Sequence, residues 1–311
     1  MMAPIRIGIV GLGKIARDQH LPAIAANPAF RLVAAADPEA RESGIASFAA
    51  LADMLAEADL DAVAICTPPM ARYEAGRLAL AHGKHVLLEK PPCASITQLE
   101  HLTRTAAAIG RTLYATWHSQ HAPAVADAQR LLRERTLRRA RINWLEDVRR
   151  WHPGQRWLRE PGGFGVFDAG INALSILTRL LPDPLFPRSA RLLVPENWAV
   201  PIAAELELES SGGAQISATM DFRHPGPPRW EIDLLTEGGS VQLADGGATL
   251  TLDNGAAPRP QASLESEYAA IYRRFAELIA HGACEVDPRP LQCVADVFLV
   301  ARHVTVAAFS E

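Results

Sequence analysis

Residues 5–10 form an apolar run that leads directly into Gly11-x-Gly13-x-x-Ala16, and this combination constrains the fold more than any other feature of the chain. Gly11 permits a tight turn at the end of a strand, Gly13 lets the backbone approach a pyrophosphate, and the small Ala16 lets the next helix pack closely on the strand. A pyrophosphate at this turn would accept hydrogen bonds from N–H groups at the helix N-terminus. The motif therefore predicts a dinucleotide-binding unit.

A second apolar run, residues 30–36, ends at Asp37, about 20 residues beyond the glycine motif, where an acid that binds the adenosine ribose is expected. A carboxylate accepts hydrogen bonds from ribose hydroxyls but repels a 2′-phosphate, so we expect NAD to be preferred over NADP. Lys14 and Arg17 would soften that repulsion, which keeps some use of NADP open.

The first 120 residues alternate strand and helix patterns, which implies an α/β unit with a parallel sheet and helices on both faces. The expected strands are 5–10, 31–36, 62–66, 85–88 and 112–116, and the expected helices are 14–26, 47–57, 71–82 and 95–109.

After about residue 138 the pattern changes to strands joined by Gly/Pro turns, which predicts a mostly antiparallel α+β sheet domain. The expected strands are 141–146, 190–194, 203–209, 214–222, 230–235, 241–243 and 248–252, and helices are expected from about Asp168, over 265–281 and over 290–309. We therefore expect a Rossmann domain over 1–120 and a domain for substrate binding and oligomerisation over 121–311, with the last helix packing back on the first domain. The open face of such a sheet is a natural surface for self-association, and a homodimer is expected.

Composition excludes several classes of protein. The 311 residues, 49% hydrophobic and 21% charged, suffice for two ordinary cores, and a net charge of −4 offers no general attraction to nucleic acid. No apolar run reaches membrane-spanning length, and a strand that starts at residue 5 leaves no room for a signal peptide, so a cytoplasmic protein is expected. The four cysteines show no C-x-x-C spacing, which favours reduced thiols and no metal site.

Two segments carry candidate catalytic groups. Lys90 follows a predicted strand of the parallel sheet, where ligands of such sheets bind, and could polarise a hydroxyl or carbonyl oxygen. A glycine-rich loop, 162–165, precedes a helix whose first turns carry Asp168 and Asn172 on one face. The alternative for Asp168 is a purely structural helix cap.

A third segment, residues 146–157, concentrates Glu146, Trp151 and His152 in a chain that is only 6% aromatic. Tryptophan faces beside hydrogen-bonding side chains suit a sugar ring, although tryptophans that fill a domain junction would look the same. Trp117 and His118, at the end of a predicted strand, are candidates for the same pocket.

With Gly11-Leu-Gly-Lys14, Glu89-Lys90-Pro91 and Asp168-x-Gly170-x-Asn172 in this order, the chain resembles the Gfo/Idh/MocA dehydrogenases from about residue 5 to 309. Segments 14–22, 115–119, 146–155 and 168–175 resemble those members that oxidise the anomeric carbon of an aldopyranose, such as D-galactose or L-arabinose, to a lactone. The resemblance implies a sugar site of Lys90, Glu146, His152, Asp168 and Asn172. The expected cofactor contacts are Gly11, Gly13, Lys14, Ile15, Asp37, Thr67, Pro68, Glu89 and Lys90.

The chain departs from the family at two positions, because the family usually has His where Asn172 stands and Asp where Ser175 stands. Asn cannot exchange a proton at neutral pH, so Asp168 or Lys90 must accept the proton of the substrate hydroxyl. The preferred aldose stays open, as do oxidation of another polyol, such as an inositol or a dihydrodiol, and a catalytically silent NAD or sugar sensor.

Overall fold

The computed structural model describes residues 3–253 and 264–310. The chain forms two compact units, each with its own sheet. Unit 1 comprises Met1–His118 and Leu264–Pro288, and unit 2 comprises Ser119–Ser263 and Arg289–Glu311. The segment that completes unit 1 thus follows all but the last strand of unit 2 in the sequence.

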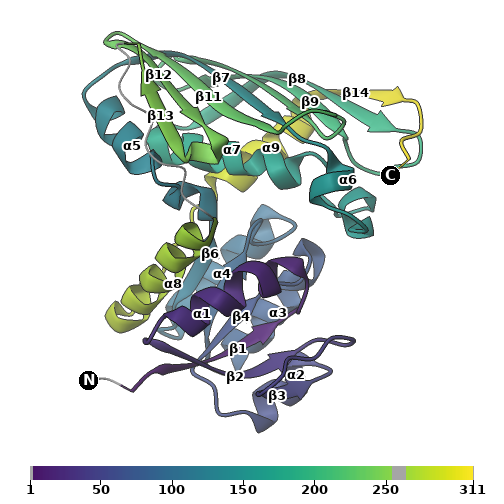
Figure 1. Ribbon diagram of the computed structural model, residues 1–311, viewed down its shortest axis with the longest axis vertical. Coiled ribbons are helices and arrows are strands. Elements are labelled where there is room, and N and C mark those ends of the chain that lie inside the picture. Colours follow the sequence, from purple (N-terminus) through teal and green to yellow (C-terminus); the bar gives the residue numbers. More distant parts are fainter. Residues whose placement is uncertain (1–2, 254–263, 311) are drawn as a thin grey trace. The chain divides into compact units, whose positions relative to one another are not determined.

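Unit 1 is built on a parallel six-stranded sheet in the order β3-β2-β1-β4-β5-β6 (Figure 1). Its strands are β1 (Ile5–Val10), β2 (Phe30–Ala36), β3 (Ala46–Phe48), β4 (Ala62–Ile65), β5 (His85–Glu89) and β6 (Leu113–Thr116). Every residue of β4 is buried, as expected for a strand covered on both faces. The strand order reverses between β1 and β4, so their carboxyl ends open the crevice in which ligands of this topology bind.

The helices of unit 1 pack against this sheet and against one another. They are α1 (Leu21–Ala26), α2 (Leu51–Glu57), α3 (Pro69–Ala81), α4 (Ile96–Ala108) and α8 (Leu264–His281). α8 buries Tyr268, Ile271, Tyr272, Phe275 and Leu278 in the core around β1, at the three- and four-residue spacing of one helix face.

Two helix predictions in unit 1 need correction. The helix expected over 14–26 has π-helical geometry over Ala16–His20 before α1 begins. The helix expected over 47–57 begins only at Leu51, because residues 46–48 pair with Ala34, Ala35 and Ala36 and form the short edge strand β3.

Unit 2 is built on an eight-stranded sheet in the order β13-β12-β11-β7-β10-β9-β8-β14. Only the β7–β10 and β8–β14 pairs are parallel, so the sheet is mostly antiparallel. Its strands are β7 (Leu137–Leu145), β8 (Leu185–Pro195), β9 (Ala203–Ser210), β10 (Gln215–Asp221), β11 (Arg229–Thr236), β12 (Gly239–Ala244), β13 (Thr249–Leu252) and β14 (Ala301–Val306).

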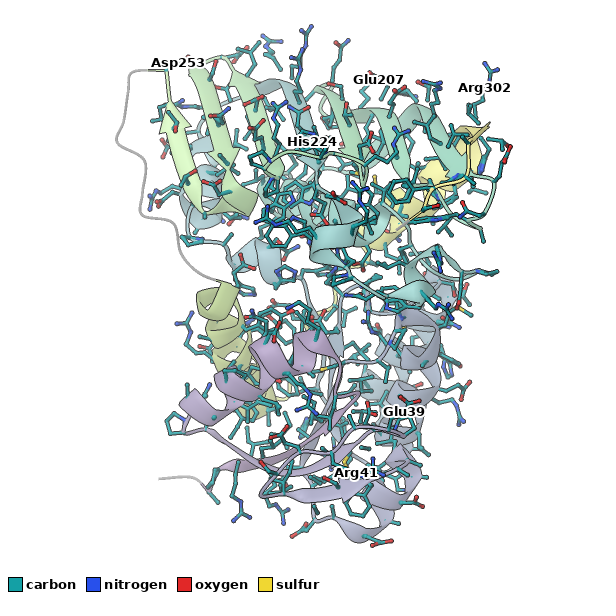
Figure 2. All side chains as sticks on the ribbon, turned by 45° about the vertical axis from the view of Figure 1, so that its right-hand side comes forward. Glu39, Arg41, Glu207, His224, Asp253 and Arg302 are labelled. Carbon is teal, nitrogen blue, oxygen red and sulfur yellow. The ribbon has the colours of Figure 1, made fainter. Side chains whose placement is uncertain are left out.

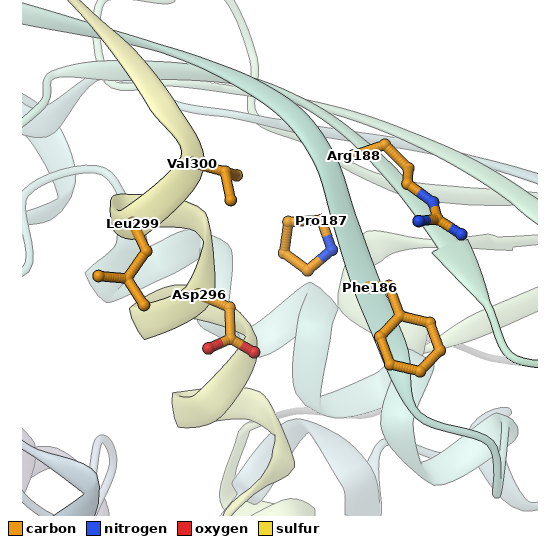
Figure 3. Close-up of a pocket in the computed structure, with 6 residues that line it drawn as sticks. All are labelled: Phe186, Pro187, Arg188, Asp296, Leu299 and Val300. Carbon is orange, nitrogen blue, oxygen red and sulfur yellow. The ribbon is translucent and has the colours of Figure 1, made fainter.

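One face of this second sheet is covered by α5 (Val125–Arg133), α7 (Phe167–Leu180) and α9 (Arg289–Val300), as Figure 1 shows. The short α6 (Val148–Trp151) follows β7. A shallow groove of about 520 Å³ lies between the start of β8 and the end of α9 (Figure 3).

The helix expected over 290–309 is wrong beyond Val300. Residues 301–306 include the β-branched Val304, Thr305 and Val306 and pair in parallel with β8. Moreover, α9 packs on α7 and β8 in unit 2, so the helix that returns to the dinucleotide-binding unit is α8 and not the last one.

Among the described residues, no helix has both the length and the apolarity that crossing a membrane requires. Cys66, Cys93 and Cys293 are buried and Cys284 is exposed, all as free thiols. Burial raises the pKa of both the Cys93 and the Cys293 thiol to about 12, so neither is a reactive thiolate at neutral pH.

Candidate active site

The glycine turn of unit 1 lies at the carboxyl end of β1. Gly11 has φ = +85°, and a Cβ there would lie 3.0 Å from the backbone N of Thr67, so only glycine fits without strain. At Gly13 a Cβ would meet nothing within 4 Å. The first glycine therefore allows close packing of two loops, and the second leaves space over the turn.

Asp37 follows β2 and is held by three backbone N–H groups. Its Oδ2 accepts a hydrogen bond from Leu12 at 2.8 Å, and its Oδ1 accepts from Glu39 at 2.9 Å and Ala40 at 2.8 Å. Partial burial acts to raise the pKa of this carboxyl, but the three N–H donors outweigh it and lower the pKa. Asp37 is thus a fixed carboxylate joined to the glycine turn through Leu12.

These residues fit a nicotinamide dinucleotide. The hydroxyl of Thr67 is buried and has no hydrogen-bond partner among the described residues, as expected of a group that awaits a ligand. The open space at Gly13 and the ionised Asp37 would serve the pyrophosphate and the ribose. Pro68 immediately precedes α3, and Ile15 packs against the core. Lys14 is exposed and paired with Asp18.

Lys90 follows β5 and is joined to Pro91 by a cis peptide bond. Its backbone N–H donates to Glu89 Oε2 at 2.7 Å. The Glu89 carboxylate is only 2% exposed, and its other oxygen accepts from Thr116 at 3.0 Å and from the Tyr268 hydroxyl. The side chain of Glu89 is thus turned into unit 1, where it holds the Lys90 backbone, and its contact with the cofactor stays a prediction.

The charge of Glu89 is balanced by His20, which sequence reasoning missed. His20 is fully buried, with Nε2 3.1 Å from Glu89 Oε1 and Nδ1 2.8 Å from the Tyr272 hydroxyl. Burial opposes protonation, but the neighbouring Cys66 and Glu89 raise the pKa of His20 to about 10. The same pair lowers the pKa of Glu89, against the effect of its burial. No spacing rule connects residues 20, 89 and 272, so only the fold reveals this pair.

Arg72, in α3, was also missed. Its guanidinium is 4% exposed and donates to the carbonyl oxygens of Thr67 at 2.7 Å and Glu89 at 2.9 Å, and also to that of Pro91. One buried cation therefore joins the loops that follow β4 and β5, which carry Thr67 and Lys90.

Trp117 and His118 have partners inside unit 1. The Trp117 ring is 3% exposed and donates its N–H to the carbonyl of Asp287 at 2.9 Å. His118 Nδ1 lies 2.6 Å from Glu267 Oε2, and its ring stacks on Tyr268. The structure gives Trp117 packing and hydrogen-bond contacts in unit 1, and the role of Trp117 and His118 in a sugar pocket stays a prediction.

In unit 2, the buried Glu146 pairs with the half-buried His152. Glu146 Oε1 lies 2.9 Å from His152 Nε2, and Glu146 Oε2 accepts the indole N–H of Trp230 at 2.8 Å. Trp230 in turn contacts Trp151 edge to face, with ring centroids 5.1 Å apart. The sequence indicated Glu146, Trp151 and His152. Trp230, about 80 residues further on, is brought to them by the pairing of β11 with β7.

Asp168 extends this group. His152 Nδ1 lies 3.9 Å from Asp168 Oδ2, so one imidazole lies between the two carboxylates. Asp168 is 4% exposed and lies in the first turn of α7, but the helix cap is Val166, which argues against the purely structural alternative. Asn172 follows one turn later and is half-buried, while Ser175 donates its hydroxyl hydrogen bond to the Asn172 carbonyl.

The glycines around Asp168 are required by packing. A Cβ at Gly163 would lie 2.2 Å from the carbonyl oxygen of Trp157, and one at Gly165 would lie 2.2 Å from that of Pro201. A Cβ at Gly170 would lie 2.2 Å from Met220 Sδ. The loop glycines therefore let the chain pack closely on residues 157 and 201, and Gly170 lets α7 approach β10.

Two buried carboxylates, a half-buried imidazole and two half-buried indole rings together supply hydrogen-bond acceptors, a proton-exchanging side chain and apolar faces. This set suits a ligand that carries many hydroxyls. Within the described residues no group of three or more His, Cys, Asp or Glu side chains has the arrangement of a metal site.

A Rossmann unit with an Asp-bearing crevice, together with a mostly antiparallel unit that carries a Glu-His-Asp group, defines a two-domain nicotinamide-dependent oxidoreductase. The chain belongs to the GFO/IDH/MocA oxidoreductase family, whose NAD-binding Rossmann fold description matches residues 5–116. It is 46% identical to the galactose 1-dehydrogenase of Pseudomonas fluorescens over 314 residues, which cover all of both chains.

Solved structures show the same relationship. The crystal structure of D-galactose-1-dehydrogenase from Rhizobium etli matches with a TM-score of 0.94 and 45% identity, and covers 100% of this chain and 99% of that one. The 3-ketoreductase KijD10 from Actinomadura kijaniata, in complex with NADP and TDP-benzene, matches with a TM-score of 0.83, 21% identity and coverage of 97% and 99%, which shows the shared fold alone.

Proposed function

We propose that the chain is an NAD(P)-dependent aldose 1-dehydrogenase that oxidises C1 of D-galactose, and of aldopyranoses with the same hydroxyl arrangement, to the aldonolactone. The Glu146–His152–Asp168 group carries this proposal, because it offers fixed partners for several sugar hydroxyls beside the Trp151–Trp230 pair. Full-length identity of 46% to a galactose 1-dehydrogenase supports the choice of substrate.

In this proposal Asp168 accepts the proton of the C1 hydroxyl, while Lys90 and Asn172 hold the C1 oxygen. The anomeric hydroxyl is more acidic than an ordinary alcohol, which brings it within reach of a carboxylate base. His152 keeps Asp168 oriented and, with Glu146, binds other hydroxyls of the ring. The nicotinamide, when bound, supplies the hydride acceptor. These roles are proposals that rest on the contacts within each unit.

Within unit 1, Gly11, Gly13 and Asp37 would hold the pyrophosphate and ribose, with Thr67, Pro68, Lys14 and Ile15 beside them. The ionised Asp37 favours NAD. Arg41 donates to the Asp37 carbonyl at 2.8 Å, and Arg17 donates to the Arg41 carbonyl at 3.0 Å. Two cations close to the ribose-binding acid would let a 2′-phosphate bind with a moderate penalty, so we propose NAD preference with measurable use of NADP.

Initial rates of nicotinamide reduction test the proposal, with D-galactose, L-arabinose, D-fucose, D-glucose and myo-inositol, each against NAD and NADP. The expected result is highest kcat/KM for the galacto-configured sugars with NAD. Activity on myo-inositol alone would instead assign another polyol. Cofactor binding without turnover on any of them would indicate a silent sensor.

A further inference from the structure

Residues 307–310 form a tail that lies against the segment carrying His152. The tail follows β14, whose Arg302 is labelled in Figure 2, and it reaches α6 (Figure 1). Asn197 holds the tail through the backbone of Phe309. The side-chain N–H of Asn197 donates to the Phe309 carbonyl at 2.8 Å, and the Phe309 N–H donates to Asn197 Oδ1 at 2.9 Å. Because both hydrogen bonds fix the same residue, the Phe309 ring has a defined place.

The Phe309 ring contacts two side chains from different segments of unit 2. The Arg149 guanidinium lies over the ring, 5.7 Å from its centroid, within the range of a cation–π interaction. The Trp198 ring meets the Phe309 ring edge to face, with centroids 6.0 Å apart. Phe309 therefore joins α6 to the loop that follows β8.

On the first side, the contact reaches His152 through α6. This helix is a single turn, and a helix of that length is not stable by itself. Arg149 lies at its start, where its guanidinium also makes two hydrogen bonds, of 2.9 and 2.8 Å, to the carboxylate of the capping Asp147. At the end of the turn, the backbone N–H of His152 donates to the Val148 carbonyl at 2.8 Å. A ring that holds Arg149 therefore also limits where the side chains of Trp151 and His152 can lie.

On the second side, the contact reaches Asp168 through the loop that carries Trp198. The Pro201 carbonyl at the end of this loop accepts a hydrogen bond from the Val166 N–H at 2.8 Å. Val166 is the cap of α7 and lies two residues before Asp168. The side chains of His152 and Asp168, which are 3.9 Å apart, thus belong to two segments that the same phenylalanine contacts or holds through one loop.

We infer that Phe309 is a positioning residue of the sugar site. Through Arg149 and Trp198, its ring holds the two segments that set the distance between His152 and Asp168. The kinetic consequence rests on the proposed function, in which His152 orients Asp168 and binds a hydroxyl of the sugar. The tie between the tail and α6 does not depend on that function.

Hydrogen exchange of the full chain, followed by mass spectrometry, tests this tie. Phe309→Ala removes both ring contacts, so the amides of residues 150–152 are expected to exchange about fivefold faster or more, while those of β4 keep their rates. Phe309→Tyr retains an aromatic ring and should match the unchanged chain. Phe186→Ala removes a phenylalanine that is 45% exposed on β8, and this matched control should leave residues 150–152 unaffected.

Steady-state rates with D-galactose test the positioning role. A displacement of about 1 Å at a reacting group costs about a hundredfold in rate, so Phe309→Ala should lower kcat/KM for D-galactose at least about tenfold. The KM for NAD should stay the same, because the dinucleotide is assigned to unit 1. Phe309→Tyr and Phe186→Ala should retain the kcat/KM of the unchanged chain.

Each result supports or overturns the inference. Unchanged exchange at residues 150–152 in Phe309→Ala would overturn it, as would faster exchange spread over both units, which indicates loss of the whole fold. Equal losses in Phe309→Tyr and Phe309→Ala would overturn the role of the ring, and faster exchange with unchanged kcat/KM would overturn the positioning role. A chain that does not oxidise D-galactose would contradict the proposed function, and the exchange rates would still decide whether the tail holds α6.

Discussion

At the scale of the residue, the proposed catalysis rests on groups whose surroundings hold them in place. Asp168 is buried against His152, and Lys90 is held through its backbone by Glu89. A positioned acid–base group contributes about two to four decades of rate. These two side chains are therefore the ones whose removal should affect turnover most.

We expect Asp168→Ala and Lys90→Ala each to lower kcat for galactose oxidation at least about a hundredfold. Affinity for NAD, measured by quenching of tryptophan fluorescence, should stay nearly unchanged, because the glycine turn and Asp37 are expected to supply most of the contacts to the dinucleotide. Leu299→Ser, on an exposed position of α9, is the activity control. Near-normal turnover in either variant would remove that residue from the proposed mechanism.

Asp37→Ser should shift cofactor preference. The substitution removes the charge that repels a 2′-phosphate and leaves Arg41 in place, so we expect the kcat/KM ratio of NADP to NAD to rise at least about tenfold, or about 1.4 kcal/mol. Steady-state rates with both cofactors measure this ratio. The same ratio in the variant and in the unchanged enzyme would show that another group sets the preference.

The buried His20–Glu89 pair predicts how stability depends on pH. Because its pKa is raised from 6.5 to about 10, His20 contributes stability that is fully present below pH 6.5 and is lost as the pH rises toward 10. Glu89, whose pKa is lowered, contributes stability that is present at pH values above its ordinary pKa of 4.5. This contribution is lost as the pH falls through the lowered pKa.

The melting temperature of the unchanged protein should therefore fall between pH 6.5 and 10, and it should fall less in the His20→Gln variant. Thermal unfolding followed by circular dichroism at half-unit pH steps would measure both curves. Parallel curves for the two proteins would mean that His20 is neutral in the folded state.

At the scale of the element, the position of α7 depends on one close contact with β10. Gly170 has no room for a methyl group beside Met220, so Gly170→Ala should destabilise the fold by about 1–3 kcal/mol through overpacking. Met220→Ala frees that space. In the Met220→Ala background, Gly170→Ala should therefore lower the free energy of unfolding much less than it does in the unchanged protein. Urea titration of the unchanged protein, the two single variants and the double variant completes this double-mutant cycle. If the two changes in free energy of unfolding simply add, the contact between Gly170 and Met220 is contradicted.

Local patterns in the sequence predict most of the elements but few of the long-range partners. The glycine turn, Asp37, Lys90, Glu146, His152 and Asp168 stand beside recognisable strand ends or helix starts, so each could be named before the fold was known. His20, Arg72 and Trp230 could not, because each acts on residues that become neighbours only when strands or helices pair. The helix expected over 290–309 runs too far because no Gly or Pro separates α9 from β14.

At the scale of the whole molecule, the proposed function assigns nucleotide recognition to the parallel sheet of unit 1 and sugar recognition to the mostly antiparallel sheet of unit 2. The boundary between them cannot be read from composition, since the chain crosses it three times, after residues 118, 263 and 288. Because unit 1 is discontinuous, patterns taken in sequence order do not assign its second segment, Leu264–Pro288, to it.

Because unit 1 is discontinuous, its two segments are synthesised at different times. The core around β1 includes five side chains of α8, which is made only after all of the intervening strands of unit 2. At about 5–20 residues per second, the ribosome needs roughly 7–30 seconds to pass from the first segment of unit 1 to the second. During that interval the nascent dinucleotide-binding sheet lacks its last helix, and the apolar surface around β1 is the part of the newborn chain that a chaperone would need to shield.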